Sequence, residues 1–199
     1  MFITLKNALK YTQLKTSIIW LFLVLAVAPS LPMFRCLIES SMTFHMVVQI
    51  PALIIAGYLV AMLPLFYQQS SKEPLALNLS LSFWLWVLFT GMFWMLPISL
   101  DKALINPYWD VFKIITLLLS GVFLRHAFAG PKILSLFFIG STIMMLFFIG
   151  YFYQGSELRL CNSYLIESQQ TAGLGLILLA FSLLFASIFK IRKDIFYPI

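Results

Sequence analysis

The sequence predicts an all-α integral membrane protein, a polytopic bundle of about six transmembrane helices that forms a single domain over residues 1–199. Of its 199 residues, 62% are hydrophobic and only 10% are charged, and the mean hydropathy is +0.98. Soluble domains carry about 25% charged residues, so a chain of this composition cannot cover a water-facing surface. Six apolar stretches approach the ~20 residues that cross a bilayer, and short polar segments separate them.

The six expected spans follow one another along the whole chain. The first covers 17–34 and comes after a lysine-bearing segment, and we predict that it stays attached as an uncleaved helix. The second covers 42–67 and contains Pro51 and Pro64, each of which removes a backbone hydrogen bond and should kink the helix. The remaining spans are expected at 79–100, 109–128, 133–153 and 171–189.

The distribution of basic residues predicts the orientation of the bundle. Six spans place both ends of the chain on one side, and most of the 13 lysines and arginines fall on that side. Basic residues gather on the cytoplasmic side of membrane proteins, so we expect cytoplasmic termini in a bacterial inner membrane. The same residues lie beside apolar spans and form no basic face, which argues against nucleic acid as a partner and leaves membrane lipid as the expected surroundings.

The stretch 39–57, ESSMTFHMVVQIPALIIAG, carries the polar groups that most need an explanation. His45 falls inside the second expected span, and helical spacing places it on one face with Met42 and Gln49, beside Met46. Polar groups within hydrocarbon cost free energy and are candidates for function. Two interpretations stay open, because His45 could bind a ligand or form a hydrogen bond between helices, and methionines commonly fill gaps in apolar cores.

The predicted topology also brings distant residues to the outer face. Sulfur and imidazole donors gather there, and together they suit Cu(I). The first helices and the third contribute Met33, Cys36, Glu39, Met42, His45, Met46, Met92 and Met95, and the last outer loop contributes Cys161, Asn162, Glu167, Gln169 and Gln170. The candidate metal ligands are His45, Met42, Met46 and Cys36. Further candidates for this site are Glu39, Gln49, Glu167, Gln169 and Gln170.

Two cysteines and a lysine near the start of the fourth expected span allow several interpretations. Cys36 and Cys161 are both expected on the oxidising side, where they could form a disulfide, bind copper or remain inert thiols. Lys113 follows Asp110 by three residues, which favours an ion pair within one helix or a side chain that reaches the interface. A partner across the bundle is the alternative. No arrangement of nucleophile, base and acid is visible, so we do not expect an enzyme.

Two segments carry a resemblance to a known family. The stretch 42–49, MTFHMVVQ, followed by Pro51, resembles the helix that bears histidine and methionine in the CtaG-type cytochrome c oxidase assembly factors. The stretch 167–173, ESQQTAG, is similar to the family's DQQ motif before a later helix. Gln49 stands where the family helix has a second histidine. The resemblance implies a role for His45, Met46, Gln49, Glu167, Gln169 and Gln170 at the site.

Three functions follow from these patterns. The resemblance implies an accessory or assembly protein of the inner membrane for a copper-containing (heme-copper) respiratory oxidase, with an outer-face copper site around His45. The first alternative is a structural subunit of a membrane complex without a metal. A small transporter is disfavoured, because transporters show broken helices at matching places in repeated halves, and Pro51 and Pro64 have no counterpart in the second half.

Overall fold

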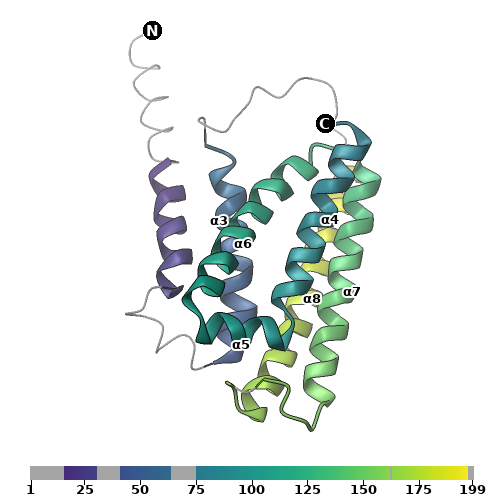
Figure 1. Ribbon diagram of the computed structural model, residues 1–199. Coiled ribbons are helices and arrows are strands. Elements are labelled where there is room, and N and C mark those ends of the chain that lie inside the picture. Colours follow the sequence, from purple (N-terminus) through teal and green to yellow (C-terminus); the bar gives the residue numbers. More distant parts are fainter. Residues whose placement is uncertain (1–15, 31–40, 64–74, 162, 197–199) are drawn as a thin grey trace.

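The computed structural model describes residues 16–30, 41–63, 75–161 and 163–196, and every regular element within these ranges is a helix. The helices stand side by side as an elongated bundle (Figure 1). The predicted all-α class is therefore confirmed. The described part of the chain contains no strand.

Four helices are long and apolar enough to cross a membrane. They are α4 (Leu77–Trp94), α6 (Pro107–Ala127), α7 (Lys132–Gly155) and the apolar part of α8, which extends over Ile166–Phe196. Helices α6 and α7 agree with their expected spans to within about two residues. Helix α8 begins at Ile166, before the expected residue 171, and α4 ends at Trp94, before the expected residue 100. The first two expected spans correspond to shorter apolar helices, Thr16–Val27 and Phe44–Val60. The structure thus supports a membrane protein, and six complete crossings remain a prediction.

The second expected span contains a change of helix type. Residues Phe44–Gln49 form a π-helical segment, η2, and the α-helix α3 continues from Ile50 to Val60. Pro51 lies in the first turn of α3, where its missing N–H cannot supply a regular helical hydrogen bond. The wider turns of η2 directly before this proline give the segment that carries His45 an irregular backbone, a feature often found at functional sites. Pro64 lies outside the described residues.

The third expected span ends earlier than the sequence indicated. We expected it to run to Leu100, but α4 ends at Trp94 and a separate helix, α5, covers Pro97–Ile105. A residue that precedes proline is driven out of the helical region, and Leu96 has the extended dihedrals φ −75° and ψ 137°. As a result α5 lies across one end of the bundle, next to the start of α6 (Figure 1).

Two pairs of helices approach at glycines. Helix α3 lies against α6, and a Cβ atom at either Gly57 or Gly121 would collide with backbone atoms of the opposite helix. Helix α7 lies against α8 in the same way at Gly150 and Gly173. Small residues that let two backbones come close are typical of helix contacts in membranes. These crossings fix how η2, α6 and the start of α8 meet.

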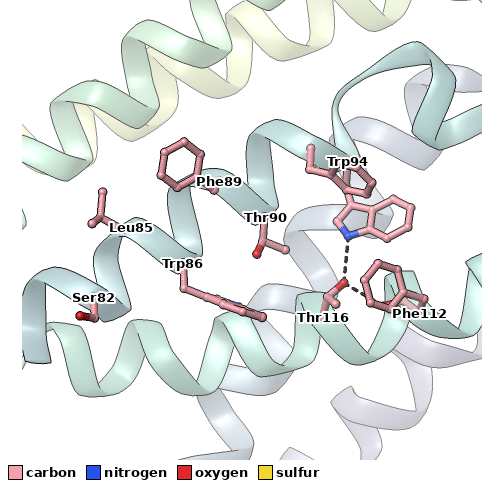
Figure 2. Close-up of a pocket in the computed structure, with 9 residues that line it drawn as sticks. Ser82, Leu85, Trp86, Phe89, Thr90, Trp94, Phe112 and Thr116 are labelled. Atoms are coloured by element: carbon pink, nitrogen blue, oxygen red, sulfur yellow. Dashed lines mark hydrogen bonds between the residues drawn. The ribbon is translucent and has the colours of Figure 1, made fainter.

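An open apolar groove of about 430 Å³ runs along α4 and α6 (Figure 2). Aromatic side chains form much of its wall. Two of its hydroxyl groups bind within the protein: Thr116 Oγ1 accepts a hydrogen bond from Trp94 Nε1 at 2.9 Å, and Ser82 Oγ donates to the carbonyl of Asn78 at 3.0 Å. The polar candidates from the sequence lie elsewhere. The lining residues are Ser82, Leu85, Trp86, Phe89, Thr90, Phe93, Trp94, Phe112 and Thr116.

Candidate functional site: a buried polar centre around His45

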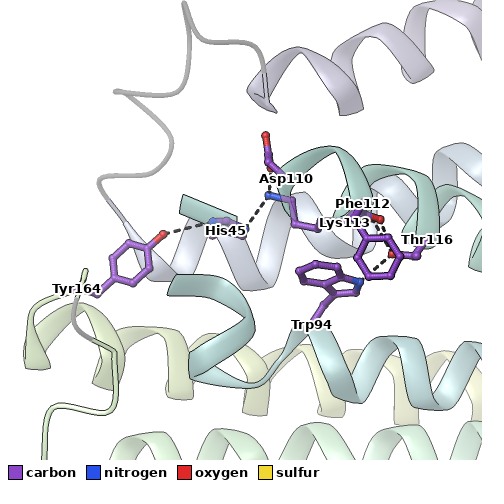
Figure 3. A network of polar contacts seen from close by, with 7 residues as sticks. All are labelled: His45, Trp94, Asp110, Phe112, Lys113, Thr116 and Tyr164. Carbon is purple, nitrogen blue, oxygen red and sulfur yellow. Dashed lines mark hydrogen bonds and ion pairs between the residues drawn. The ribbon is translucent and has the colours of Figure 1, made fainter. Parts of the chain in front are cut away.

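His45 lies at the centre of a buried chain of polar contacts. Its Nε2 atom is 3.0 Å from Lys113 Nζ on α6, and its Nδ1 atom is 3.3 Å from Tyr164 Oη in the segment before α8 (Figure 3). The His45 side chain is fully buried. One imidazole ring therefore joins η2 to α6 and to the segment between α7 and α8. Its partners Lys113 and Tyr164 are 68 and 119 residues from His45 in the sequence.

Lys113 also forms an ion pair with Asp110, as the spacing of three residues predicted. Lys113 Nζ is 2.6 Å from Asp110 Oδ1, and the two side chains are only 1% and 7% exposed. Asp110 lies in the first turn of α6, where a negative charge is favoured by the helix dipole. Asn106 caps the same turn by accepting a hydrogen bond from the backbone N–H of Tyr108 at 2.9 Å. The start of α6 is thus built to hold a buried carboxylate.

The chemistry of Lys113 determines the proton positions on His45. An ammonium group donates hydrogen bonds and has no lone pair, so His45 Nε2 must accept from Lys113. In neutral imidazole the other nitrogen then carries the proton, and Nδ1–H donates to Tyr164 Oη. The centre consequently contains a fixed tautomer, held from one side by a cation and from the other by a phenol.

The segment that carries Tyr164 is held in place by its own polar contacts. Arg159 Nε donates to the carbonyl oxygens of Tyr164 at 2.8 Å and Cys161 at 3.2 Å. The backbone N–H of Ser163 donates to Asp101 Oδ1 on α5 at 3.2 Å. These contacts position the phenol for His45. The sequence analysis did not single out Tyr164, and its one available signal was its location in the same outer loop as Cys161.

Sulfur-bearing side chains do gather beside this centre, as predicted. Met42, Met46, Met95 and Cys161 belong to one buried cluster that also includes Tyr164. Cys161 is a free thiol, and its Sγ lies 3.8 Å from the carbonyl oxygen of Pro97. Burial, with a smaller contribution from the negative charge of Asp101, raises the pKa of the Cys161 thiol to about 12. Because metals bind the thiolate form, this environment opposes ligation by Cys161.

His45 does not fit the role of a copper ligand in this arrangement. Its accepting nitrogen already faces the ammonium of Lys113, and its other nitrogen is engaged with Tyr164. A metal ion bound at Nε2 would lie next to a buried positive charge, and like charges repel strongly where water is excluded. Within the described ranges, no three histidine, cysteine, aspartate or glutamate side chains come together to hold a metal ion.

The candidates from the later motif occupy different surroundings. Gln169 is buried, whereas Glu167 and Gln170 are exposed at the start of α8. Gln169 Oε1 accepts from the backbone N–H of Leu160 at 2.9 Å, and its Nε2 donates towards the carbonyl oxygens at the end of α7 and in the following segment at 3.4–3.5 Å. Gln169 therefore holds the segment that carries Tyr164.

We predict that Gln169→Leu destabilises the protein by about 1–3 kcal/mol, because the buried N–H of Leu160 would lose its acceptor. The matched control is Gln170→Leu, since Gln170 is the exposed neighbour in the same helix turn. Unfolding of the purified protein in detergent by increasing denaturant gives both free energies. Equal stability for the two variants would contradict the assigned role of Gln169.

Several predicted candidates are not placed by the structure. Cys36, Glu39 and Met33 lie outside the described residues, so a disulfide between Cys36 and Cys161 remains a prediction. Gln49 is buried at the end of η2. Met92 is exposed on α4. Of the two interpretations of His45, the geometry supports a hydrogen bond between helices, because the ring on η2 contacts Lys113 on α6.

Comparisons of this chain with protein-family models, with curated proteins and with solved structures gave no match. The resemblance to the CtaG-type assembly factors thus rests on the two short segments described above.

Proposed function

We propose that this protein is an accessory or assembly protein of the bacterial inner membrane that acts on a copper-containing respiratory oxidase by direct contact. Two lines support the proposal. The first is that the apolar helices are long enough for a membrane protein. The second is that the segments 42–51 and 167–173 resemble an oxidase-assembly family. In this proposal copper belongs to the oxidase, since the surroundings of His45 do not fit a copper ligand.

The observation that carries the proposal is an exposed apolar surface at one end of the bundle. Ile105 of α5 and Tyr108 of α6 are 78% and 84% exposed, and Ile98, near the start of α5, is also exposed. Leu158 and Leu165, in the segment between α7 and α8, are also exposed and lie at the same end as α5 (Figure 1). Exposed apolar side chains at one end of the bundle favour contact with another protein.

The charge pattern of the sequence supports an orientation with this end on the outer side of the membrane. The segments at the opposite end carry more lysine and arginine, which by the positive-inside pattern face the cytoplasm. The proposed contact surface would then lie on the side where the copper centres of a respiratory oxidase are completed. Buried polar contacts around His45, Lys113 and Tyr164 would keep this end of the bundle in one shape.

A site-specific crosslink tests the proposed contact. A photo-crosslinking residue is placed at Ile105 in the cell, and the matched control is the same residue at Ile133, which is similarly exposed at 71% but lies at the start of α7, at the other end of the bundle. We expect a crosslink to an oxidase subunit from position 105 and none from position 133. Crosslinks from neither position, or equally from both, would contradict the proposal.

A structural subunit without a metal is the second candidate, and a specific observation favours it. Both ring nitrogens of His45 are engaged by protein groups, as expected of a histidine that joins helices. The copper content of the oxidase in a strain that lacks this chain separates the two functions. Loss of an assembly protein should leave an oxidase deficient in copper. Loss of a structural subunit should leave an oxidase with normal copper but weakened association of its subunits.

A further inference from the structure

We propose that Lys113 is the built-in cation of a site formed by His45 and Asp110, so that this centre holds a tethered ammonium in the place where a metal ion would bind. The inference concerns the chain itself and does not depend on the proposed partner. It rests on the position of a single atom, Lys113 Nζ, between an imidazole nitrogen and a carboxylate oxygen (Figure 3).

Two of the atoms that contact Lys113 Nζ, His45 Nε2 and Asp110 Oδ1, are of the kinds that bind cations. Imidazole nitrogen and carboxylate oxygen are common ligands of divalent metals, at about 2.0–2.2 Å. Here the two distances to Nζ are 3.0 Å from His45 Nε2 and 2.6 Å from Asp110 Oδ1, which are hydrogen-bond lengths. The spacing of the two donors therefore matches an ammonium group that lies between them.

Burial makes this cation a permanent part of the structure. Lys113 and His45 are 1% and 0% exposed, and the ammonium is covalently attached to α6 through its own side chain. A free metal ion can leave for solvent, but Lys113 Nζ can leave only if α6 and η2 separate. The imidazole lone pair is thus kept occupied, and the ring is fixed against α6.

Removal of the lysine side chain should convert the centre into a site for a free cation. Lys113→Ala would leave the accepting nitrogen of His45 and the carboxylate of Asp110 facing a space from which a cation has been removed. A small cation supplied from solution could then restore the lost interaction. We expect such a response from Co²⁺, which suits imidazole and carboxylate donors, and from methylammonium, which reproduces the end of the lysine side chain.

The test uses the purified full chain in detergent. Wild type, Lys113→Ala and the double variant Lys113→Ala/His45→Gln are titrated with CoCl₂, followed by the visible absorption of bound Co²⁺ and by thermal unfolding. We expect Lys113→Ala to bind Co²⁺ at least tenfold more tightly than wild type, and the double variant to lose this gain. Methylammonium should raise the unfolding temperature of Lys113→Ala and leave that of wild type unchanged.

Two outcomes would overturn the inference. One is wild-type protein that binds Co²⁺ through His45 as tightly as Lys113→Ala does. The other is Lys113→Ala that responds to neither cation. If Lys113→Ala is recovered unfolded, the yield of folded protein with and without methylammonium replaces the thermal measurement, and a yield that methylammonium does not raise counts against the inference. Lys113→Ala/Asp110→Asn, which removes the uncompensated carboxylate, should fold without added cation and show no Co²⁺ gain.

Discussion

Lys113→Met is expected to destabilise the protein by about 3–5 kcal/mol, because it leaves the carboxylate of Asp110 buried without its cation. Methionine keeps most of the length of the lysine side chain, so the loss reports the charge more than the volume. The free energy of unfolding in detergent, measured with increasing denaturant, gives the effect. The matched control is Lys102→Met, since Lys102 is exposed and contacts the face of Trp109 at 4.9 Å, an interaction worth about 0.5–1 kcal/mol.

A second substitution separates the ion pair from the rest of the site. When Asp110 is replaced as well, in Lys113→Met/Asp110→Leu, neither charge of the ion pair remains, and replacing a whole buried pair by apolar groups is often neutral. We therefore expect the double variant to recover most of the lost stability. A double variant as unstable as the sum of its two single variants would contradict a direct interaction between Lys113 and Asp110.

Gly57→Ala and Gly121→Ala are each expected to cost about 3 kcal/mol or more. Overpacking costs about 1–3 kcal/mol where side chains can adjust, but here the added Cβ would meet backbone atoms of the facing helix, which cannot turn aside. The measurement is the free energy of unfolding in detergent, with the yield of folded protein as a second readout. Because α3 continues η2, which carries His45, and α6 carries Lys113, the same variants should weaken the polar centre.

Gly140→Ala provides the control for these two glycines. A Cβ atom at Gly140 would have no neighbour within 4 Å, and alanine is about 1 kcal/mol more favourable than glycine inside a helix. We expect this variant to be neutral or slightly stabilised. Equal losses at Gly57, Gly121 and Gly140 would show that the close crossing of α3 and α6 is not the cause.

The sequence predicts the helices well, because hydropathy and helix-ending residues are local properties. The expected spans 109–128 and 133–153 differ from α6 and α7 by no more than two residues at each end. The third span differs more, because an apolar stretch continues past Trp94 although the chain turns at Pro97. Pro97 is a helix-ending residue and indicated the break. The residues around it are apolar, so the stretch was assigned to one continuous span and α5 was not predicted as a separate helix.

Only part of the polar centre could be predicted from the sequence. The pair of Lys113 and Asp110 follows from a spacing of three residues within one helix. The contacts of His45 with Lys113 and Tyr164 join segments far apart in sequence, so they depend on how the helices cross, and spacing alone cannot specify that. The sequence did indicate a common depth, since His45 and Lys113 both lie near the outer ends of their expected spans.

The copper content of the purified protein, loaded with Cu(I) under reducing conditions, tests the central claim most directly. The claim is that Lys113 occupies the cation position at His45, so wild type and His45→Gln should both bind far less than one copper per chain at this centre and should not differ. Near-stoichiometric copper in wild type that is lost in His45→Gln would contradict the account and identify His45 as a metal ligand.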